Sequence, residues 1–216
     1  MSPVGRPKVP LIEREAAIAK ALEIIDRDGV EAFSIRNLGK ELGVNGASLY
    51  HHFKDKEEIL EGVRLLIVRD ARVILKSSAR ATWQDYARTS CTRYRAALLA
   101  HPHVAPLMSP GLIRPSSQVV ARDHLVEMMV EAGVPMELAY PIMDSVEMLA
   151  FGSAVLNPHR LRPDERFPLK AEHHAPHLEQ AIKATHRSAD KLFKVELDAL
   201  LDGWAAVIAR EGQGRR

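Results

Sequence analysis

The stretch that decides the fold is SIRNLGKELGVNGASLYHHFKDKEEIL, residues 34–60. An apolar helical pattern ends at Gly43, and Asn45 can then cap a short third helix. This helix has one narrow apolar face, formed by Leu49 and Phe53. Its other positions carry many groups that form hydrogen bonds: Ser48, Tyr50, His51 and His52. So many polar groups on so short a segment argue against burial, because each would need a partner inside a core.

The segments on either side also read as helices with recognisable ends. An apolar stripe at helical spacing precedes the quoted stretch and consists of Leu11, Ile18, Leu22 and Ile25. Gly29 stands where a left-handed residue would end that helix, and Ser34 can cap the next one. Asp55 followed by Glu58 resembles a capping box and opens a long fourth helix over residues 56–78.

The rest of the chain has the same helical periodicity, divided by Pro and Gly. It predicts helices at about 82–99, 116–132, 135–156 and 188–210. Pro141 should kink or interrupt its helix. The segment 157–175 is polar and rich in Pro and is predicted to be a long loop. No period-2 pattern of useful length occurs, so the predicted fold class is all-α.

Composition narrows the class of protein. The 216 residues carry a formal charge of +2, too small for the field of the whole chain to drive nucleic-acid binding. The single cysteine, Cys91, excludes a disulfide framework within the chain and fits a reducing compartment. Residues 1–10 read as a flexible basic arm and not as a secretory signal. With no membrane-spanning run, a cytoplasmic protein is expected.

The two helices joined by ELGVNG predict a helix-turn-helix, whose second helix lies in the major groove of DNA. Side chains that can reach base edges and the backbone then follow from their chemistry. Asn45, Ser48 and His51 suit base edges, and Ala47 suits a thymine methyl group. The full set of predicted DNA-binding residues is Arg36, Asn45, Gly46, Ala47, Ser48, Tyr50, His51, His52 and Lys56. In the alternative interpretation, Tyr50 and His52 pack at the edge of a three-helix core.

The same run resembles the DNA-binding segment of the tetracycline-repressor (TetR) family of bacterial regulators. Gly39 departs from the pattern, because the family usually has Ala there. The matching positions are Ser34, Arg36, Leu38, Leu42, Gly43, Val44, Leu49, Tyr50, His52, Phe53, Lys56 and Leu60. Near the other end of the chain, RFPLKAE and FKVELDALLDGWAAVI resemble the C-terminal region of the tetracycline-repressor branch.

The resemblance implies an N-terminal three-helix DNA-binding domain, residues 11–55, and a larger helical domain, residues 56–216, that binds an effector and dimerises. It implies a homodimeric repressor that a small molecule releases from a palindromic operator on double-stranded DNA. Residues 142–156 and 188–210 have enough apolar surface to pair with their symmetry mates. No cofactor and no membrane partner are indicated.

The residues predicted to bind the effector are ones that pack loosely or that supply a single polar group in an apolar stretch. They are His101, His103, Met108, Met129, Met143, Glu147 and Phe151. The alternative for each Met is plain core, the commoner role of Met at helical spacing. No metal site is predicted, since the His pairs lack Asp, Glu or Cys partners at a recognised spacing. The resemblance leaves open that His101 contacts a metal ion carried by the effector.

Two other classes of function compete with an effector-controlled regulator. An enzyme is disfavoured, because the chain has no G-x-S-x-G, P-loop or H-E-x-x-H motif. A DNA-binding protein without a ligand stays open, although residues 56–216 form a large domain for dimerisation alone.

Overall fold

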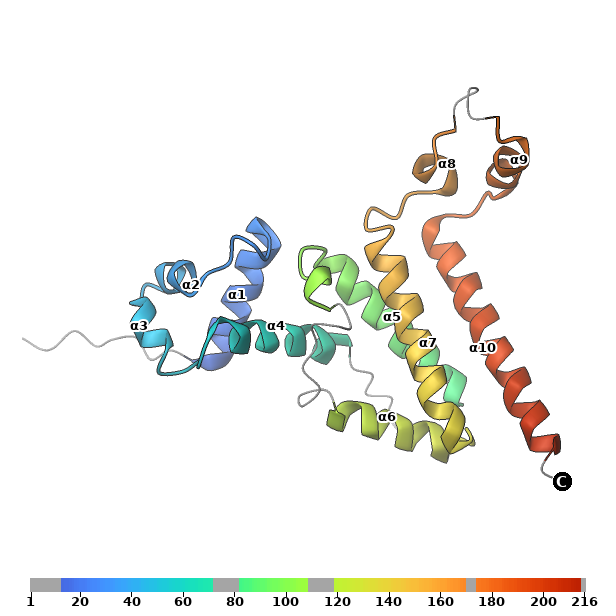
Figure 1. Ribbon diagram of the computed structural model, residues 1–216, viewed down its shortest axis with the longest axis horizontal. Coiled ribbons are helices and arrows are strands. Elements are labelled where there is room, and N and C mark those ends of the chain that lie inside the picture. Colours follow the sequence, from blue (N-terminus) through green and yellow to red (C-terminus); the bar gives the residue numbers. More distant parts are fainter. Residues whose placement is uncertain (1–12, 72–81, 109–118, 170–173, 215–216) are drawn as a thin grey trace, which may run out of the picture. The chain divides into compact units, whose positions relative to one another are not determined.

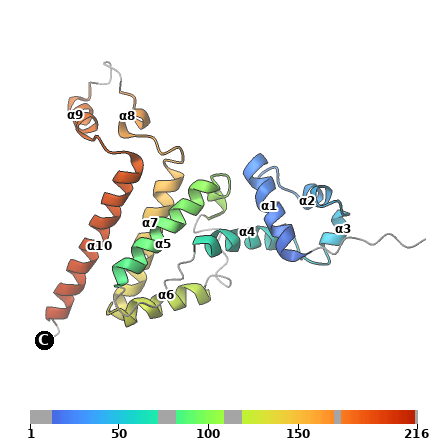
Figure 2. The ribbon, with the colours of Figure 1, turned by 180° about the vertical axis from the view of Figure 1, so that it is seen from behind.

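The computed structural model describes residues 13–71, 82–108, 119–169 and 174–214, and every regular element in these ranges is a helix (Figures 1 and 2). The predicted all-α class is confirmed. The chain divides into two compact units, Met1–Arg69 with His103–Arg114, and Asp70–Pro102 with Pro115–Arg216. The basic arm predicted at residues 1–10 lies outside the described residues.

The described residues of the first unit form four α-helices and one 3-10 turn. They are α1 (Arg14–Asp28), α2 (Ile35–Glu41), α3 (Gly46–Leu49), α4 (Lys56–Ala71) and η1 (Ala105–Met108). The first three pack around side chains that are at most 1% exposed, including Phe33, Leu38, Leu49, Phe53 and Ile59. Apolar burial at these sites fixes the angle at which α2 and α3 meet.

The helix ends follow the capping chemistry expected from the sequence, with one difference. Ser34 Oγ accepts a hydrogen bond from the Asn37 amide at 3.1 Å, and Gly29 has a positive φ of 83°. Asp55 Oδ1 accepts from the Glu58 amide at 2.9 Å, as in a capping box. The Glu58 carboxylate, however, accepts from the Lys54 amide, one residue before the cap. The capping box is therefore half formed, and Glu58 also fixes the chain that enters α4.

Gly62 sets the distance between α1 and α4. A Cβ added at this position would lie 2.5 Å from Ile18 Cδ1 and 2.8 Å from Ile18 Cγ1. We expect Gly62→Ala to destabilise the protein by about 1–3 kcal/mol through overpacking, even though Ala is the better helix former. Gly203→Ala in the second unit is the control, because no atom lies within 4 Å of its added Cβ. Urea unfolding of both variants tests this, and equal stability would contradict it.

The second unit is a helical layer with a shorter appendage. Its helices are α5 (Trp83–Ala100), α6 (Val119–Glu131), α7 (Met136–Val155), α8 (Pro163–Arg166), α9 (Pro176–Ala184) and α10 (Ala189–Gly214). α5, α7 and α10 lie side by side, and α6 runs across one end of α5 and α7 (Figures 1 and 2). Between α7 and α10, the chain forms α8 and α9 beyond the N-terminal end of α10.

The prediction of a loop over residues 157–175 is wrong in part, since α8 lies within it and α9 follows directly. Proline is the first residue of both helices, at Pro163 and Pro176. Its missing N–H costs no hydrogen bond there, because the first N–H of a helix has no intrahelical acceptor. Pro141 does not interrupt α7. It lies in the second turn, where few intrahelical bonds precede it.

Cys91 is part of the core that joins α5, α7 and α10. Its side chain is 1% exposed, and the thiol donates to the Val146 carbonyl at 3.4 Å. Burial raises the pKa of the thiol to about 12. We therefore expect the folded protein to react with a thiol reagent at pH 8 about a thousandfold more slowly than glutathione does, since the thiolate is the reactive form. Protein unfolded in urea should react at the glutathione rate, and rapid labelling of the folded chain would contradict this packing.

Candidate nucleic-acid interface and effector region

The turn between α2 and α3 brings the two helices into close contact. Gly43 takes a φ of 67°, which favours glycine, and Asn45 Oδ1 caps α3 by accepting from the Ala47 amide at 3.1 Å. A Cβ on Gly39 would lie 3.0 Å from the Val44 carbonyl oxygen and 3.1 Å from the Gly46 amide. Gly39, the departure from the family pattern, therefore lies where α2 and the start of α3 approach most closely.

The third helix is shorter than predicted, because α3 ends at Leu49 and residues 50–52 form turns. The amides of His51 and His52 donate to carbonyls three residues earlier, at 3.3 Å and 2.9 Å. Tyr50 is 59% exposed, and both histidines are also exposed. The alternative in which Tyr50 and His52 pack at a core edge is not what the structure shows.

Most of the predicted DNA-binding set lies on α2, on α3 and in the turns on either side of α3. Leu49 is fully buried, so the polar positions around it share the outer side of α3. Arg36 and Lys40, from α2, are exposed. The predicted residues of the loop, α3 and the following turn are exposed or half-buried: Asn45, Gly46, Ala47, Ser48, Tyr50, His51 and His52.

Lys56 differs from the other predicted DNA-binding residues in its contacts within the protein. Its ammonium group donates to the Phe33 carbonyl at 2.6 Å and lies 5.5 Å from the centre of the Phe33 ring. Lys56 therefore ties the start of α4 to the loop before α2. An ammonium group has three donors, so one bond to Phe33 leaves others for an anion.

Arg14 is a positioning residue that sequence reasoning missed. Its guanidinium lies 4.5 Å from the centre of the Phe53 ring, donates to Glu58 at 2.6 Å and donates to the His52 carbonyl. These contacts hold the turn that carries His51 and His52. The Lys54 amide and then Arg14 lower the pKa of the Glu58 carboxyl, so the carboxylate that anchors them stays charged. No sequence signal links Arg14 to residues about forty positions away.

The predicted effector residues have several different environments. Met108, Met129 and Met143 are at most 4% exposed, as in the plain-core alternative, and Met129 packs in the core of the second unit. His103 is exposed, and its Nδ1 donates to the Asp26 carbonyl at 2.8 Å. His101 ends α5, where its amide donates to the carbonyls of Ala97 and Leu98.

Glu147 and Phe151 lie on α7 and are partly exposed. Arg122 of α6 donates to Glu147 at 2.7 Å. Burial raises the pKa of the Glu147 carboxyl despite this partner. Burial, together with the Glu147 charge, also raises the pKa of the Tyr94 hydroxyl on α5. Tyr94, Arg122 and Glu147 form a polar cluster between α5, α6 and α7. The Glu147 carboxyl in this cluster has a raised pKa.

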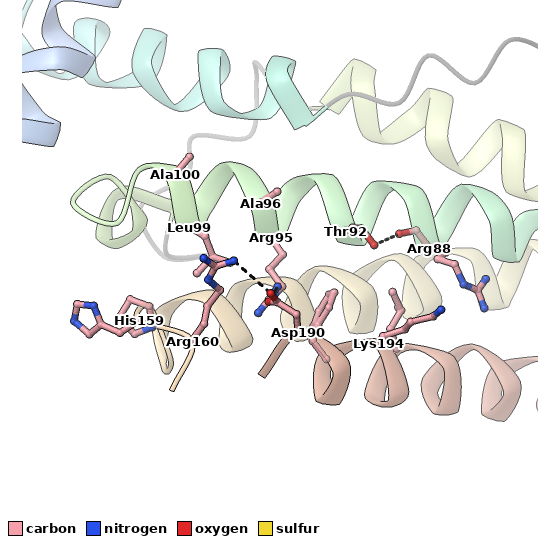
Figure 3. Close-up of a pocket in the computed structure, with 13 residues that line it drawn as sticks. Arg88, Thr92, Arg95, Ala96, Leu99, Ala100, His159, Arg160, Asp190 and Lys194 are labelled. Carbon is pink, nitrogen blue, oxygen red and sulfur yellow. Dashed lines mark hydrogen bonds and ion pairs between the residues drawn. The ribbon is translucent and has the colours of Figure 1, made fainter. Parts of the chain in front are cut away.

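A separate cleft of about 740 Å³ opens between α5, the start of α10 and the chain after α7 (Figure 3). None of the seven predicted effector residues lines it. Arg95 of α5 and Arg160 both bind Asp190, at 2.9 Å and 3.3 Å. Arg95 is also anchored by Ser153 at 3.1 Å and lies 4.4 Å from the centre of the Phe193 ring.

The residues that the structure describes contain no group of three or more His, Cys, Asp or Glu side chains placed to hold a metal ion. No helix among them has the length and apolar character needed to cross a bilayer.

Comparison with known families decides the class of protein. Residues 17–63 match the model of the bacterial regulatory proteins of the tetR family, and residues 77–208 match the tetracyclin repressor-like C-terminal domain. The chain belongs to the tetR family. It is a transcriptional regulator with an N-terminal DNA-binding domain and a C-terminal domain of the type found in tetracycline repressors.

Relatives with curated functions agree with this class. The tetracycline repressor protein class D of Escherichia coli is 25% identical over 202 residues, 89% of each chain. An HTH-type transcriptional regulator of Saccharopolyspora erythraea is 26% identical over 148 residues, which cover 68% of this chain and 58% of that relative.

Solved structures share the fold along nearly the whole chain. BioQ of Mycobacterium smegmatis is 28% identical, with a TM-score of 0.67 over 91% of this chain and 99% of its own. A structure of BioQ with its double-stranded DNA operator has a TM-score of 0.61 at 24% identity, over 91% and 99%. ActR of Streptomyces coelicolor, in complex with actinorhodin, has a TM-score of 0.74 at 22% identity, over 93% and 98%.

Proposed function

We propose that this tetR-family chain is a homodimeric repressor that binds a palindromic operator and is released from it by a small molecule. The observation that carries the proposal is the contrast between the buried residue that ends α3 and the exposed polar residues of the turn after it. Leu49 is fully buried, while Tyr50, His51 and His52 beside it are exposed. Exposed polar groups on a turn that is anchored by a buried helix residue suit base edges and phosphates.

The DNA-binding role belongs to Arg36, Asn45, Gly46, Ala47, Ser48, Tyr50, His51, His52 and Lys56. Ser48 and His51 read base edges, whereas Arg36, Tyr50 and Lys56 bind phosphate oxygens. Asn45 contributes through its amide nitrogen, because its oxygen caps α3. Support comes from BioQ, a protein of the same fold that has been crystallised with its DNA operator. Such a regulator acts where the chromosome lies, in the bacterial cytoplasm.

Dimerisation is supported by an apolar stripe on α7. Met136, Tyr140, Met148 and Val155 lie at helical spacing and are each at least 37% exposed. A stripe of this size on a single chain marks an interaction surface, and an isologous dimer buries it against its copy.

We expect Met148→Glu to convert a dimer into a monomer, because it places two charges opposite each other in an apolar interface. Sedimentation velocity at micromolar concentration measures this. Val119→Glu, at a position on α6 that is 52% exposed, should leave the dimer intact. A wild-type chain that sediments as a monomer would contradict the dimer itself.

The effector-binding role is proposed for His101, His103, Met108, Met129, Met143, Glu147 and Phe151. The Arg122–Glu147 pair and Tyr94 offer polar contacts between three helices, and the methionines adapt to a ligand's shape. Support comes from ActR, which shares the fold and has been crystallised with actinorhodin, and from the tetracycline repressors.

Operator selection tests the proposal as a whole. Purified protein is used to select duplexes from a randomised pool, and fluorescence anisotropy then measures affinity for the product. A palindrome with half-sites about one helical turn apart is expected, since a symmetric dimer reads two major grooves on one face of DNA. Weak binding that does not depend on sequence would overturn the assignment.

A further inference from the structure

The cleft between α5 and α10 carries more positive than negative charge. Four cationic side chains line it: Arg88, Arg95, Arg160 and Lys194. Two carboxylates pair with them, Asp190 within the cleft and Asp198, which accepts from Arg88 at 2.7 Å. Counting both carboxylates, two positive charges remain in excess. A partly enclosed site with such an excess attracts anions, because its low-dielectric walls weaken solvent screening.

The positive groups of the cleft are held to different degrees. Arg95 is nearly buried, and Asp190, Ser153 and the Phe193 ring fix its position. Lys194 lies one turn along α10 from Asp190, and within the described ranges it forms no hydrogen bond or ion pair. Lys194 is therefore a cation that has no partner among the described residues and is available to an incoming anion, on the other side of Asp190 from Arg160 (Figure 3).

Most of the remaining lining is apolar, apart from Thr92 and His159. Ala96, Leu99 and Ala100 of α5 face the cleft from one side, and Phe193 and Leu197 of α10 from the other. The volume of about 740 Å³ lies in the range of pockets that bind small organic molecules. Apolar walls with a few convergent charges suit a molecule that has an apolar body and one charged end.

We propose that this cleft binds an organic carboxylate with an apolar, ring-sized body. The carboxylate pairs with the Lys194 ammonium group, and the body lies on Leu99, Phe193 and Leu197. Asp190 keeps Arg95 and Arg160 in place. The site is distinct from the polar cluster at Glu147, and its existence does not depend on the proposed operator or effector release.

Saturation-transfer NMR on the full chain, without DNA, tests the site with 2-naphthoate and with uncharged 2-naphthylmethanol. We expect 2-naphthoate to bind and the alcohol to bind at least about tenfold more weakly, since it lacks the charge-assisted hydrogen bonds. Lys194→Ala should weaken 2-naphthoate binding by about tenfold. Lys191→Ala removes an exposed lysine of α10 outside the cleft and should leave binding unchanged.

Ala96→Trp is a second test, because it fills the cleft at an exposed position without altering any charge. It should abolish the 2-naphthoate signal while leaving the circular dichroism spectrum unchanged. The proposal is overturned if 2-naphthoate does not bind at millimolar concentration, if it binds Ala96→Trp as well as wild type, or if acid and alcohol bind equally. Because no DNA is present, each of these outcomes leaves the DNA-binding proposal to its own test.

Discussion

His51→Ala should weaken binding to the selected operator by about 5- to 150-fold, or about 1–3 kcal/mol, and relax the preference at one base pair in each half-site. His51 is exposed, and its backbone is held in the turn after α3 by its bond to the Ser48 carbonyl. Removing the ring thus leaves the fold and the neighbouring contacts in place. Fluorescence anisotropy on the operator and on duplexes changed at single base pairs measures both effects.

Arg36→Ala gives the contrasting result, because a phosphate contact carries no sequence information. It should weaken binding to all duplexes alike and lower the slope of log affinity against log salt by about one per half-site. His177→Ala, an exposed histidine on α9, should change neither property and serves as the control. If His51→Ala instead behaved like Arg36→Ala, His51 would contact the DNA phosphate backbone. Asn45 and Ser48 would then be the residues that contact base edges.

The helix ends of the first unit were predictable because their chemistry is local. Ser34, Asn45 and Asp55 each bond an amide two or three residues away, so the cap is visible in a short sequence window. Arg14 and Lys56 act over distances of about twenty residues or more, on Phe53, Glu58 and the Phe33 carbonyl. Nothing in local spacing reveals such contacts, and they hold the turn after α3 in place.

In the second unit, too, the sequence predicts the helices better than the candidate binding sites. The long helices follow from the periodicity of apolar residues, but the periodicity does not tell which methionines line a cavity. Met129 and Met143 have the spacing of core residues and are buried. The cleft instead takes its charged lining from Arg95, Arg160 and Lys194, which belong to different segments of the chain. From the sequence, each of these charged residues is expected on the surface. No pattern in the sequence indicates that they lie close together.

Arg64 on α4 is only 1% exposed although it carries a charge. Its Nε donates to Glu61 at 2.8 Å, and its Nη2 donates to Glu57. The side chain of Glu61 is only 16% exposed. Removing the guanidinium would therefore leave a largely buried carboxylate without this partner, together with a large void.

We expect Arg64→Ala to destabilise the protein by about 3–5 kcal/mol, measured by urea unfolding at pH 7. Arg27→Ala is a matched control, since Arg27 also binds two carboxylates, Asp28 and Glu41, but is 56% exposed. It should shift the urea midpoint little, because exposed ion pairs contribute little to stability. Equal shifts for the two variants would show that burial does not govern the strength of these pairs.

Arg64→Met separates the two causes of the loss. Methionine fills most of the space of the arginine stem, so it restores packing without restoring charge. If the loss of this charged partner dominates, Arg64→Met should be nearly as unstable as Arg64→Ala. If packing dominates, Arg64→Met should lie close to wild type. The stability of this one variant thus decides whether Arg64 stabilises α4 by charge or by volume.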